Sequence, residues 1–265
     1  MTSALYEVNG SLIALVLFCS ILLAIEGGYR LGRKKQVSAS DPIKSQFSAI
    51  QGSLLGLVSL LLGFSFSLAV NHYDHRSKAM VEEVNAIGTT YLRAHSLPPT
   101  VKEETLDLLR KYVDVRVQAS QITLADKVSR EPLLREASHI RTKLWSLAMQ
   151  SARDDDRVTT SGLYIQALGG LIDSYTARDE VLNRHIPEIV IISLLLTFIL
   201  AGGVLGYTSG AAGHRPTMPV FLFVAIIVII VSIIMDLDRP RRGFIQVTQK
   251  NMLELQQEVN HQHQR

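Results

Sequence analysis

Four apolar runs separated by charged segments constrain the fold of this chain more than any other feature of its sequence. They occupy about residues 11–25, 47–70, 186–207 and 218–235. Each is close to the roughly 20 residues that a helix needs to cross about 30 Å of hydrocarbon. Of the 265 residues, 47% are hydrophobic and only 19% are charged, as expected where much of a chain lies in lipid. We therefore predict four transmembrane helices.

The first run has the length of a secretory signal, but its flanks differ from those of a signal. No basic residue precedes the run, and the segment "EGGYRLGRKK" follows it in place of a small-residue cleavage pattern. We interpret the run as a retained membrane anchor. Cys19, the only cysteine, lies inside it, which excludes an intramolecular disulfide and gives no zinc-type spacing.

Between the second and third runs, about 110 residues follow a helical pattern without strand-like alternation. Apolar residues at helical spacing continue the second run beyond the membrane, and no proline or paired glycine interrupts them. This stripe consists of Met80, Val84, Ile87 and Tyr91. One unbroken helix is therefore predicted from about residue 46 to about residue 94.

Three further helices are predicted in this region. The first opens at Thr100, with Glu103 at capping-box spacing, and runs to about Asp126. The second begins around Pro132 and ends at the charged segment 152–157, and the third begins around Val158. The predicted fold is an all-α membrane protein with four transmembrane helices and a helical cytoplasmic extension.

This pattern divides the chain into five segments. They are 1–45, the first transmembrane helix and a basic loop; 46–94, the second helix continuing into the soluble region; 95–185, the helical cytoplasmic region; 186–236, the third and fourth transmembrane helices; and 237–265, a polar C-terminal tail with a short amphipathic helix.

Basic residues give the orientation only a slight preference. The loop after the first run and the opposite side of the membrane carry nearly equal numbers of them, with a small excess on the side of residues 76–184 and 239–242. The positive-inside rule then favours a cytoplasmic soluble region and cytoplasmic termini. The basic residues gather beside the apolar runs and form no stripe with interleaved aromatics, so no nucleic-acid partner is predicted.

The sequence offers little for catalysis, and we predict no enzyme activity, no cofactor and no metal site. It has no Gly-rich phosphate loop, no G-x-S-x-G and no H-E-x-x-H. His72, Asp74 and His75 form the nearest metal-like cluster, but a polar helix end at headgroup level explains them better, because zinc sites need further ligands at definite spacing. The aspartates at 154–156 lack the ligand pattern of a calcium loop and are interpreted as a solvated turn.

Small residues recur at intervals of about four in two of the apolar runs. The second run carries Gly52 with Gly56 and Ser59 with Gly63 and Ser67, and the third carries Gly202, Gly206 and Gly210. Such rows let helix backbones approach closely in lipid. An uncharged helix lined on one side by Gly and Ser is also typical of a pore. The sequence leaves both interpretations open.

The stretch "LLGFSFSLAVNHYDHRSKAMVEEVNAIGTTYLRA", 61–94, resembles the second membrane helix of bestrophins. "LIDSYTARDEVLNRHIPEIVI" resembles the approach to their third span, and "DLDRPRRGFIQVTQKNML" the turn after their fourth. More closely, the chain resembles a bacterial family of bestrophin-like membrane proteins. The residues that carry this likeness are Tyr73, Asp74, Arg76, Glu82, Glu83, Asn85, Ala86, Ile87, Gly88, Thr90, Tyr91, Leu92 and Arg93, followed by Asp236, Asp238, Arg239, Pro240 and Gly243.

The resemblance implies a pentameric anion channel whose second helices line the pore. Matched on L-G-F, the three constricting positions fall on Phe64, Leu60 and Gly56. Gly56 departs from the apolar pattern, so two rings would form the constriction. The polar mouth would be lined by Asn71, His72 and Arg76. The dense acidic run of the calcium clasp is reduced here to Asp236 and Asp238, so calcium gating is not predicted.

The sequence thus predicts a multi-pass homo-oligomer of the bacterial cytoplasmic (inner) membrane that conducts small inorganic anions such as chloride passively. Its predicted partners are the lipid bilayer, further copies of itself and the anions. The alternative is a membrane-anchored interaction or sensor module without a conducting pore. A secondary transporter is less favoured, because no inverted repeat is present.

Overall fold

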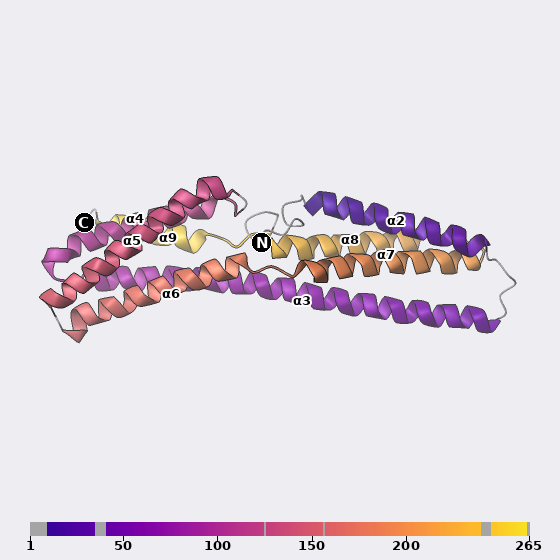
Figure 1. The fold of residues 1–265 in the computed structure, drawn as a ribbon, viewed down its shortest axis with the longest axis horizontal. Helices are drawn as coiled ribbons and strands as arrows, with labels where there is room; N and C mark the ends of the chain where they lie inside the picture. Colours follow the sequence, from indigo (N-terminus) through magenta and orange to yellow (C-terminus); the bar gives the residue numbers. More distant parts are fainter. Residues whose placement is uncertain (1–9, 35–40, 125, 156, 240–244, 264–265) are drawn as a thin grey trace. The chain divides into compact units, whose positions relative to one another are not determined.

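The computed structural model describes residues 10–34, 41–124, 126–155, 157–239 and 245–263 (Figure 1). Within these ranges every regular element is a helix, which confirms the predicted fold class. In chain order the elements are α2 (Gly10–Lys34), α3 (Asp41–Ala94), α4 (Pro99–Gln121), α5 (Lys127–Asp154), a π-helical turn (Val158–Gly162), α6 (Leu163–Asn183), α7 (Glu188–Ala211), α8 (Met218–Asp238) and α9 (Lys250–His263).

The described residues form two compact units. We call the first the membrane unit: it contains α2, α3 as far as His72, and residues 185–239 with α7 and α8. The second, the extramembrane unit, contains residues 73–184, with the rest of α3, α4, α5 and α6, together with α9. The single helix α3 contributes to both units. It runs without a break through the predicted range of residues 46–94.

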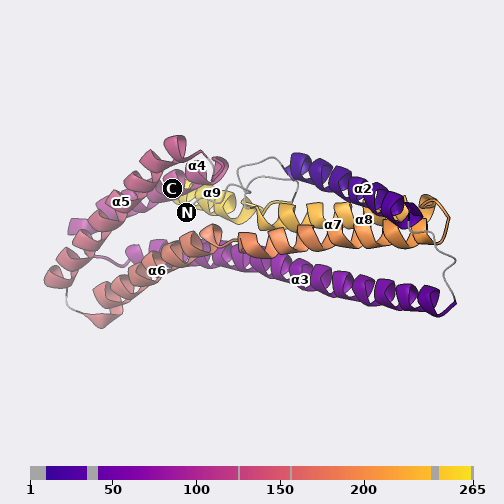
Figure 2. The same ribbon diagram turned by 45° about the vertical axis from the view of Figure 1, so that its right-hand side comes forward.

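Four segments among the described residues are long and apolar enough to cross a membrane. They lie in α2, in α3, in the segment that ends with α7, and in α8, which confirms the four predicted transmembrane helices. Pro187 is the residue that precedes the first turn of α7, so the proline marks a helix start rather than a bend. Figures 1 and 2 show α2, α7 and α8 running side by side.

Helices α2 and α7 pack backbone against backbone. A Cβ atom added at Gly206 would lie 2.0 Å from the carbonyl oxygen of Ile25, and one at Gly210 would lie 2.2 Å from that of Tyr29. On the partner helix, a Cβ at Gly28 would lie 2.1 Å from the oxygen of Gly203. No side chain fits in these positions, so the small-residue row of α7 serves close helix packing.

The extramembrane unit has a core of large apolar side chains. The stripe predicted on α3 is buried at Met80, Ile87 and Tyr91, with Val84 packed against it. Helix α4 adds an apolar face at helical spacing that consists of Leu106, Leu109, Val113 and Val117. Helices α5 and α6 contribute further core residues, which include Ile140, Leu144, Leu168 and Leu171.

Three sequence-based details of this unit are wrong. Pro98 precedes α4 and Pro99 begins it, and no side chain caps the helix; the Thr100 hydroxyl donates instead to Asp154 at 2.9 Å, so the capping box does not form. Helix α4 ends at Gln121, because the backbone at Ile122 is extended. Helix α5 begins at Lys127, before Pro132, because the carboxylate of Asp126 accepts a hydrogen bond from the Ser129 amide and caps the helix there.

The segment that sequence reasoning assigned to a polar tail contributes to the core. Its amphipathic helix is present as α9, and Met252, Leu255 and Val259 on this helix are buried in the extramembrane unit. The hydroxyl of Tyr91 on α3 donates to the carbonyl oxygen of Val259 at 3.4 Å. The end of the chain therefore completes a core that begins about 170 residues earlier.

Candidate functional site

In the described part of the membrane unit, α3 has one face that packs on its own chain and one that does not. Val58, Ser65 and Ala69 are buried against the other helices. On the opposite side, seven residues at intervals of three and four are exposed. We call them the exposed row: Ser53, Gly56, Leu60, Phe64, Ser67, Asn71 and Asp74, of which Asp74 lies on the same helix just beyond the membrane unit. Because the intervals follow the helical repeat, all seven share one face.

The three residues predicted to form the constriction all lie on the exposed row. The side chain of Phe64 is 66% exposed and that of Leu60 is 55% exposed, although both are large and apolar. A Cβ atom added at Gly52, Gly56 or Gly63 would meet no atom within 4 Å. These three glycines of α3 are therefore not used for packing within the described part of this chain, in contrast to Gly206 and Gly210 of α7.

Only one of the three residues predicted for the pore mouth lies on this row. Asn71 is exposed, but Arg76 is buried and its Nη2 donates to the carbonyl oxygen of Arg184 at 2.7 Å. His72 is directed to Asp238, with 2.8 Å between its Nδ1 and Oδ1 of the aspartate. The inward placement of Arg76 and His72 disfavours a direct role for them at a mouth lined by the exposed row.

The two aspartates in the last turn of α8, Asp236 and Asp238, stabilise the ends of the membrane helices. Asp238 is buried, and its Oδ2 accepts a hydrogen bond from the amide of Ile186 at 2.9 Å, just before α7. His185 Nδ1 lies 3.1 Å from the carbonyl oxygen of Asp238. Asp236 accepts from the amide of Ile245 at 2.8 Å. Of the other motif residues in this segment, Arg239 is buried, whereas Pro240 and Gly243 lie outside the described residues.

The motif residues on the part of α3 that follows His72 also include both exposed and buried side chains. Asp74, Glu82 and Asn85 are exposed and Tyr73 is partly buried. Glu83 is completely buried and accepts from Arg116 on α4, with 2.7 Å from Nε to Oε1 and 3.0 Å from Nη2 to Oε2.

A second arginine completes this buried ion network. Arg178 on α6 donates through Nη1 to Oε2 of Glu83 and through Nη2 to Oε1 of Gln249, the latter at 3.1 Å. Burial by itself would raise the pKa of Glu83, but Arg116 and Arg178 outweigh it and hold that pKa below its usual range. Glu83 is therefore ionised in the folded protein at neutral pH.

Sequence reasoning identified Glu83 as a motif residue but missed its partners. The available signal was its position: Glu83 lies between Met80 and Ile87 on the buried stripe of α3. A carboxylate at such a position requires a cationic partner, since an unpaired buried charge is very costly. The pattern alone does not say which of the chain's arginines supplies it.

The chain is similar to known proteins in sequence pattern and in structure. The family described as the bestrophin-like domain matches residues 28–252. A mutant of a bacterial bestrophin homolog from Klebsiella pneumoniae has a TM-score of 0.65 and 14% sequence identity, covering 94% of this chain and 96% of that one. A further solved structure, described as a membrane protein, has a TM-score of 0.63 at 14% identity, covering 92% of this chain and 97% of that one. At these identities the structural likeness shows the fold. No curated protein matches the chain.

Proposed function

Because this chain belongs to the bestrophin-like family, we propose that it forms a passive ion channel in which the exposed rows of several copies surround a pore. The observation that carries the proposal is that the exposed row has no partner among the described residues, although it lies on a membrane helix. The row combines large apolar side chains with small polar ones. In a pore, the large apolar side chains would form a narrow section and the small polar side chains would line hydrated sections.

The narrow section is formed by Phe64 and Leu60. Their exposed side chains lie one helical turn apart, so symmetry-related copies would place two apolar rings around the axis. Such rings resist hydration because their walls offer water no hydrogen bonds, and a constriction of this kind gates by dewetting. Gly56, one turn further, leaves the pore wider at the third position.

The likeness to bestrophins favours small inorganic anions such as chloride, a homo-oligomer that is pentameric by that likeness, and the bacterial cytoplasmic membrane with the extramembrane unit in the cytoplasm. On the exposed row, the Asn71 amide can donate hydrogen bonds to an anion. Asp74 lies one turn beyond Asn71 on the same row, and its carboxylate favours a cation instead. Cation conduction is therefore the second candidate for the permeating ion.

A double substitution tests the pore. Leu60→Ala together with Phe64→Ala should increase ion flux into liposomes that contain the purified protein, because the apolar rings become wider and easier to hydrate. The matched control is Leu61→Ala with Phe66→Ala, two exposed side chains that lie off the row, for which wild-type flux is expected. An intact oligomer that conducts neither before nor after the substitution would exclude the channel.

The sign of the ion is read from the reversal potential in asymmetric KCl. An anion channel shifts this potential toward the chloride equilibrium value, and a cation channel shifts it toward the potassium value. Asp74→Asn should move the potential toward chloride if Asp74 lines the mouth. An unchanged potential would place Asp74 outside the conduction path.

The alternative is an interaction or sensor module in which the exposed row packs tightly against another protein chain. Gly56→Leu separates the two functions. In a pore, leucine narrows an open section, so flux should fall while the oligomer persists on size-exclusion chromatography. In a tightly packed interface, leucine would force the backbones apart, and the oligomer should dissociate.

A further inference from the structure

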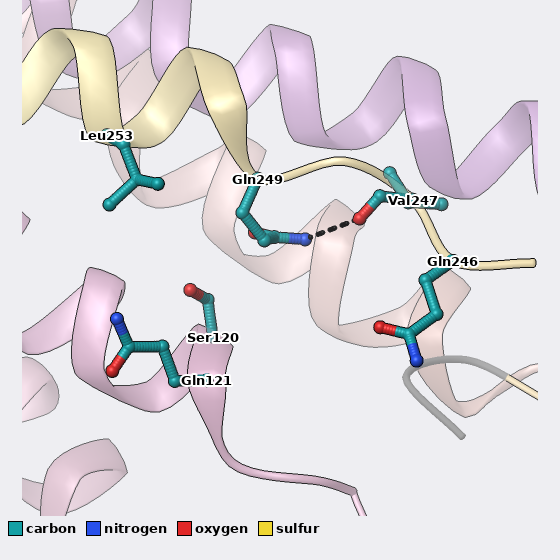
Figure 3. A pocket seen from close by; sticks show the side chains of 6 residues that line it. All are labelled: Ser120, Gln121, Gln246, Val247, Gln249 and Leu253. Atoms are coloured by element: carbon teal, nitrogen blue, oxygen red, sulfur yellow. Dashed lines mark hydrogen bonds between the residues drawn. The ribbon is translucent and has the colours of Figure 1, made fainter. Parts of the chain in front are cut away.

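We propose that the extramembrane unit binds a small organic carboxylate in a cavity between the end of α4 and the start of α9. The cavity has a volume of about 230 Å³. Figure 3 shows its lining: Ser120, Gln121, Gln246, Val247, Gln249 and Leu253. This site belongs to the extramembrane unit alone, and it does not depend on whether the chain conducts ions.

The lining is suited to a small molecule with a polar and an apolar end. Ser120 and Gln121 project from the end of α4, while Gln249 and Leu253 lie across the cavity on the side of α9 (Figure 3). Four of the six lining side chains are uncharged hydrogen-bonding groups, and Val247 and Leu253 supply apolar surface. A few convergent polar groups beside apolar side chains are typical of ligand pockets.

An excess of buried positive charge lies directly behind one wall of this cavity. Among the described residues of the extramembrane unit, the buried charged side chains are Arg76, Arg116, Arg178 and Glu83. Arg116 and Arg178 share the single carboxylate of Glu83, so this group of three carries a net charge of +1. In a protein interior that charge is weakly screened and attracts an anion to the nearest opening.

Gln249 connects this charge to the cavity. Its Oε1 accepts the hydrogen bond from Nη2 of Arg178 at 3.1 Å, and its Nε2 donates to the carbonyl oxygen of Val247 at 3.1 Å. A neutral amide is a weaker partner for a guanidinium than a carboxylate is. A ligand carboxylate that replaces the Gln249 amide oxygen on Arg178 neutralises the excess charge, and a short apolar chain then contacts Val247 and Leu253.

Equilibrium dialysis of radiolabelled butyrate against the purified full-length protein tests the site. Butyrate should bind saturably, and its neutral isostere butyramide should bind at least about tenfold more weakly, because only the carboxylate forms an ion pair with Arg178, whereas the amide offers a neutral oxygen. Chloride is held constant in both experiments. Absence of saturable butyrate binding, or equal binding of butyramide, would overturn the proposal. Neither result involves ion flux, so the channel is tested separately.

Two substitutions locate the ligand. Gln249→Glu places a side-chain carboxylate beside Arg178, where it competes with the ligand. Butyrate binding should become at least about tenfold weaker while the variant still folds. The matched control is Gln257→Glu, which adds the same charge at an exposed position on α9 outside the cavity and should leave binding unchanged. An equal loss in both variants would show that net charge alone governs binding and would overturn the site.

Leu253→Trp fills the cavity without changing any charge and should also abolish butyrate binding. Thermal unfolding of each variant verifies that it is folded. If the tryptophan variant is folded and binds butyrate as the wild type does, the anion lies outside this cavity and the proposal is wrong.

Discussion

In the membrane unit, α2 and α7 meet where side chains are absent, whereas in the extramembrane unit α3, α4 and α6 meet around a buried carboxylate. The glycines of α2 and α7 bring backbone atoms into direct contact. Glu83 is instead surrounded by two arginines that pair with both of its oxygens. In lipid, burying an apolar side chain gains little, so helices associate through close backbone packing. In a core that forms in water, the burial of large apolar side chains supplies the stability, and a buried charge is tolerated where it is fully paired.

The largest effect is expected where the paired charge is removed. Glu83→Ala leaves Arg116 and Arg178 buried without their carboxylate and should lower the free energy of unfolding by about 3–5 kcal/mol. Denaturant unfolding of the purified protein in detergent, followed by circular dichroism, measures the change. Glu82→Ala, at the exposed neighbouring position, should have little effect. If the two variants are equally stable, the ion network does not hold the unit together.

A smaller but still damaging effect is expected in the membrane unit. Gly206→Ala adds a Cβ 2.0 Å from the backbone oxygen of Ile25, so α2 and α7 must separate, at a cost of about 1–3 kcal/mol. Gly203→Ala, on the same helix, brings its Cβ no closer than 3.9 Å to another atom and should be tolerated. The same unfolding measurement compares the two. Equal stability would mean that backbone contact between α2 and α7 is not needed.

The pH dependence of unfolding distinguishes the units further. The pKa of Glu83 is lowered in the folded protein from an ordinary value of 4.5. The carboxylate therefore contributes its full stabilisation above about pH 4.5 and loses it as the pH falls through the lowered pKa. Stability should decrease by up to about 1.4 kcal/mol per pH unit in this range from Glu83 alone. Glu83→Gln should be less stable at pH 7, and its free energy of unfolding should depend less on pH in the acidic range. An unchanged pH dependence would mean that other carboxylates cause it.

The smallest expected effect is a gain in stability. Gly170 lies inside α6 and is exposed, and a Cβ atom added there would meet no other atom within 4 Å, so alanine fits without contact. Gly170→Ala should stabilise the extramembrane unit by about 0.5–1 kcal/mol, because alanine restricts the unfolded chain and favours a helix. Thermal unfolding should show a slightly raised midpoint. A lower midpoint would indicate a close neighbour at this position, as at Gly206.

The sequence predicts the helices well because their signals are local. Apolar runs of membrane length and the stripe from Met80 to Tyr91 depend only on the spacing of residues along the chain. The boundaries of α4 and α5 are predicted less well, since the extended backbone at Ile122 ends α4 early and Asp126 caps α5 ahead of Pro132. The role of α9 was not predictable from its polar composition, because its three buried residues find their partners far away in the sequence.

The candidate site was predicted only in part. The row with Phe64, Leu60 and Gly56 follows from helical spacing, and all three lie on one face that has no partner among the residues that the structure describes. Arg76 follows Asn71 closely in the sequence, which suggests a place beside it at the mouth. The sequence does not reveal that Arg76 turns inward and donates to the carbonyl oxygen of Arg184. Likewise, the glycines of α3 and α7 have similar spacing, but those of α7 pack against α2, whereas a Cβ atom added at position 52, 56 or 63 of α3 would meet no atom of the described residues within 4 Å. The spacing alone does not show whether a second helix lies opposite.

The discontinuous construction of the extramembrane unit has a consequence for biosynthesis. Residues 73–184 leave the ribosome before α7 and α8 are made, whereas Gln249, Met252, Leu255 and Val259 follow both helices. Until then, Arg178 lacks its glutamine partner and the core lacks three apolar side chains. The unit therefore completes its folding only after the last two membrane helices have been synthesised. A nascent chain that fails to insert α8 correctly keeps an open apolar core, which chaperones and proteases recognise.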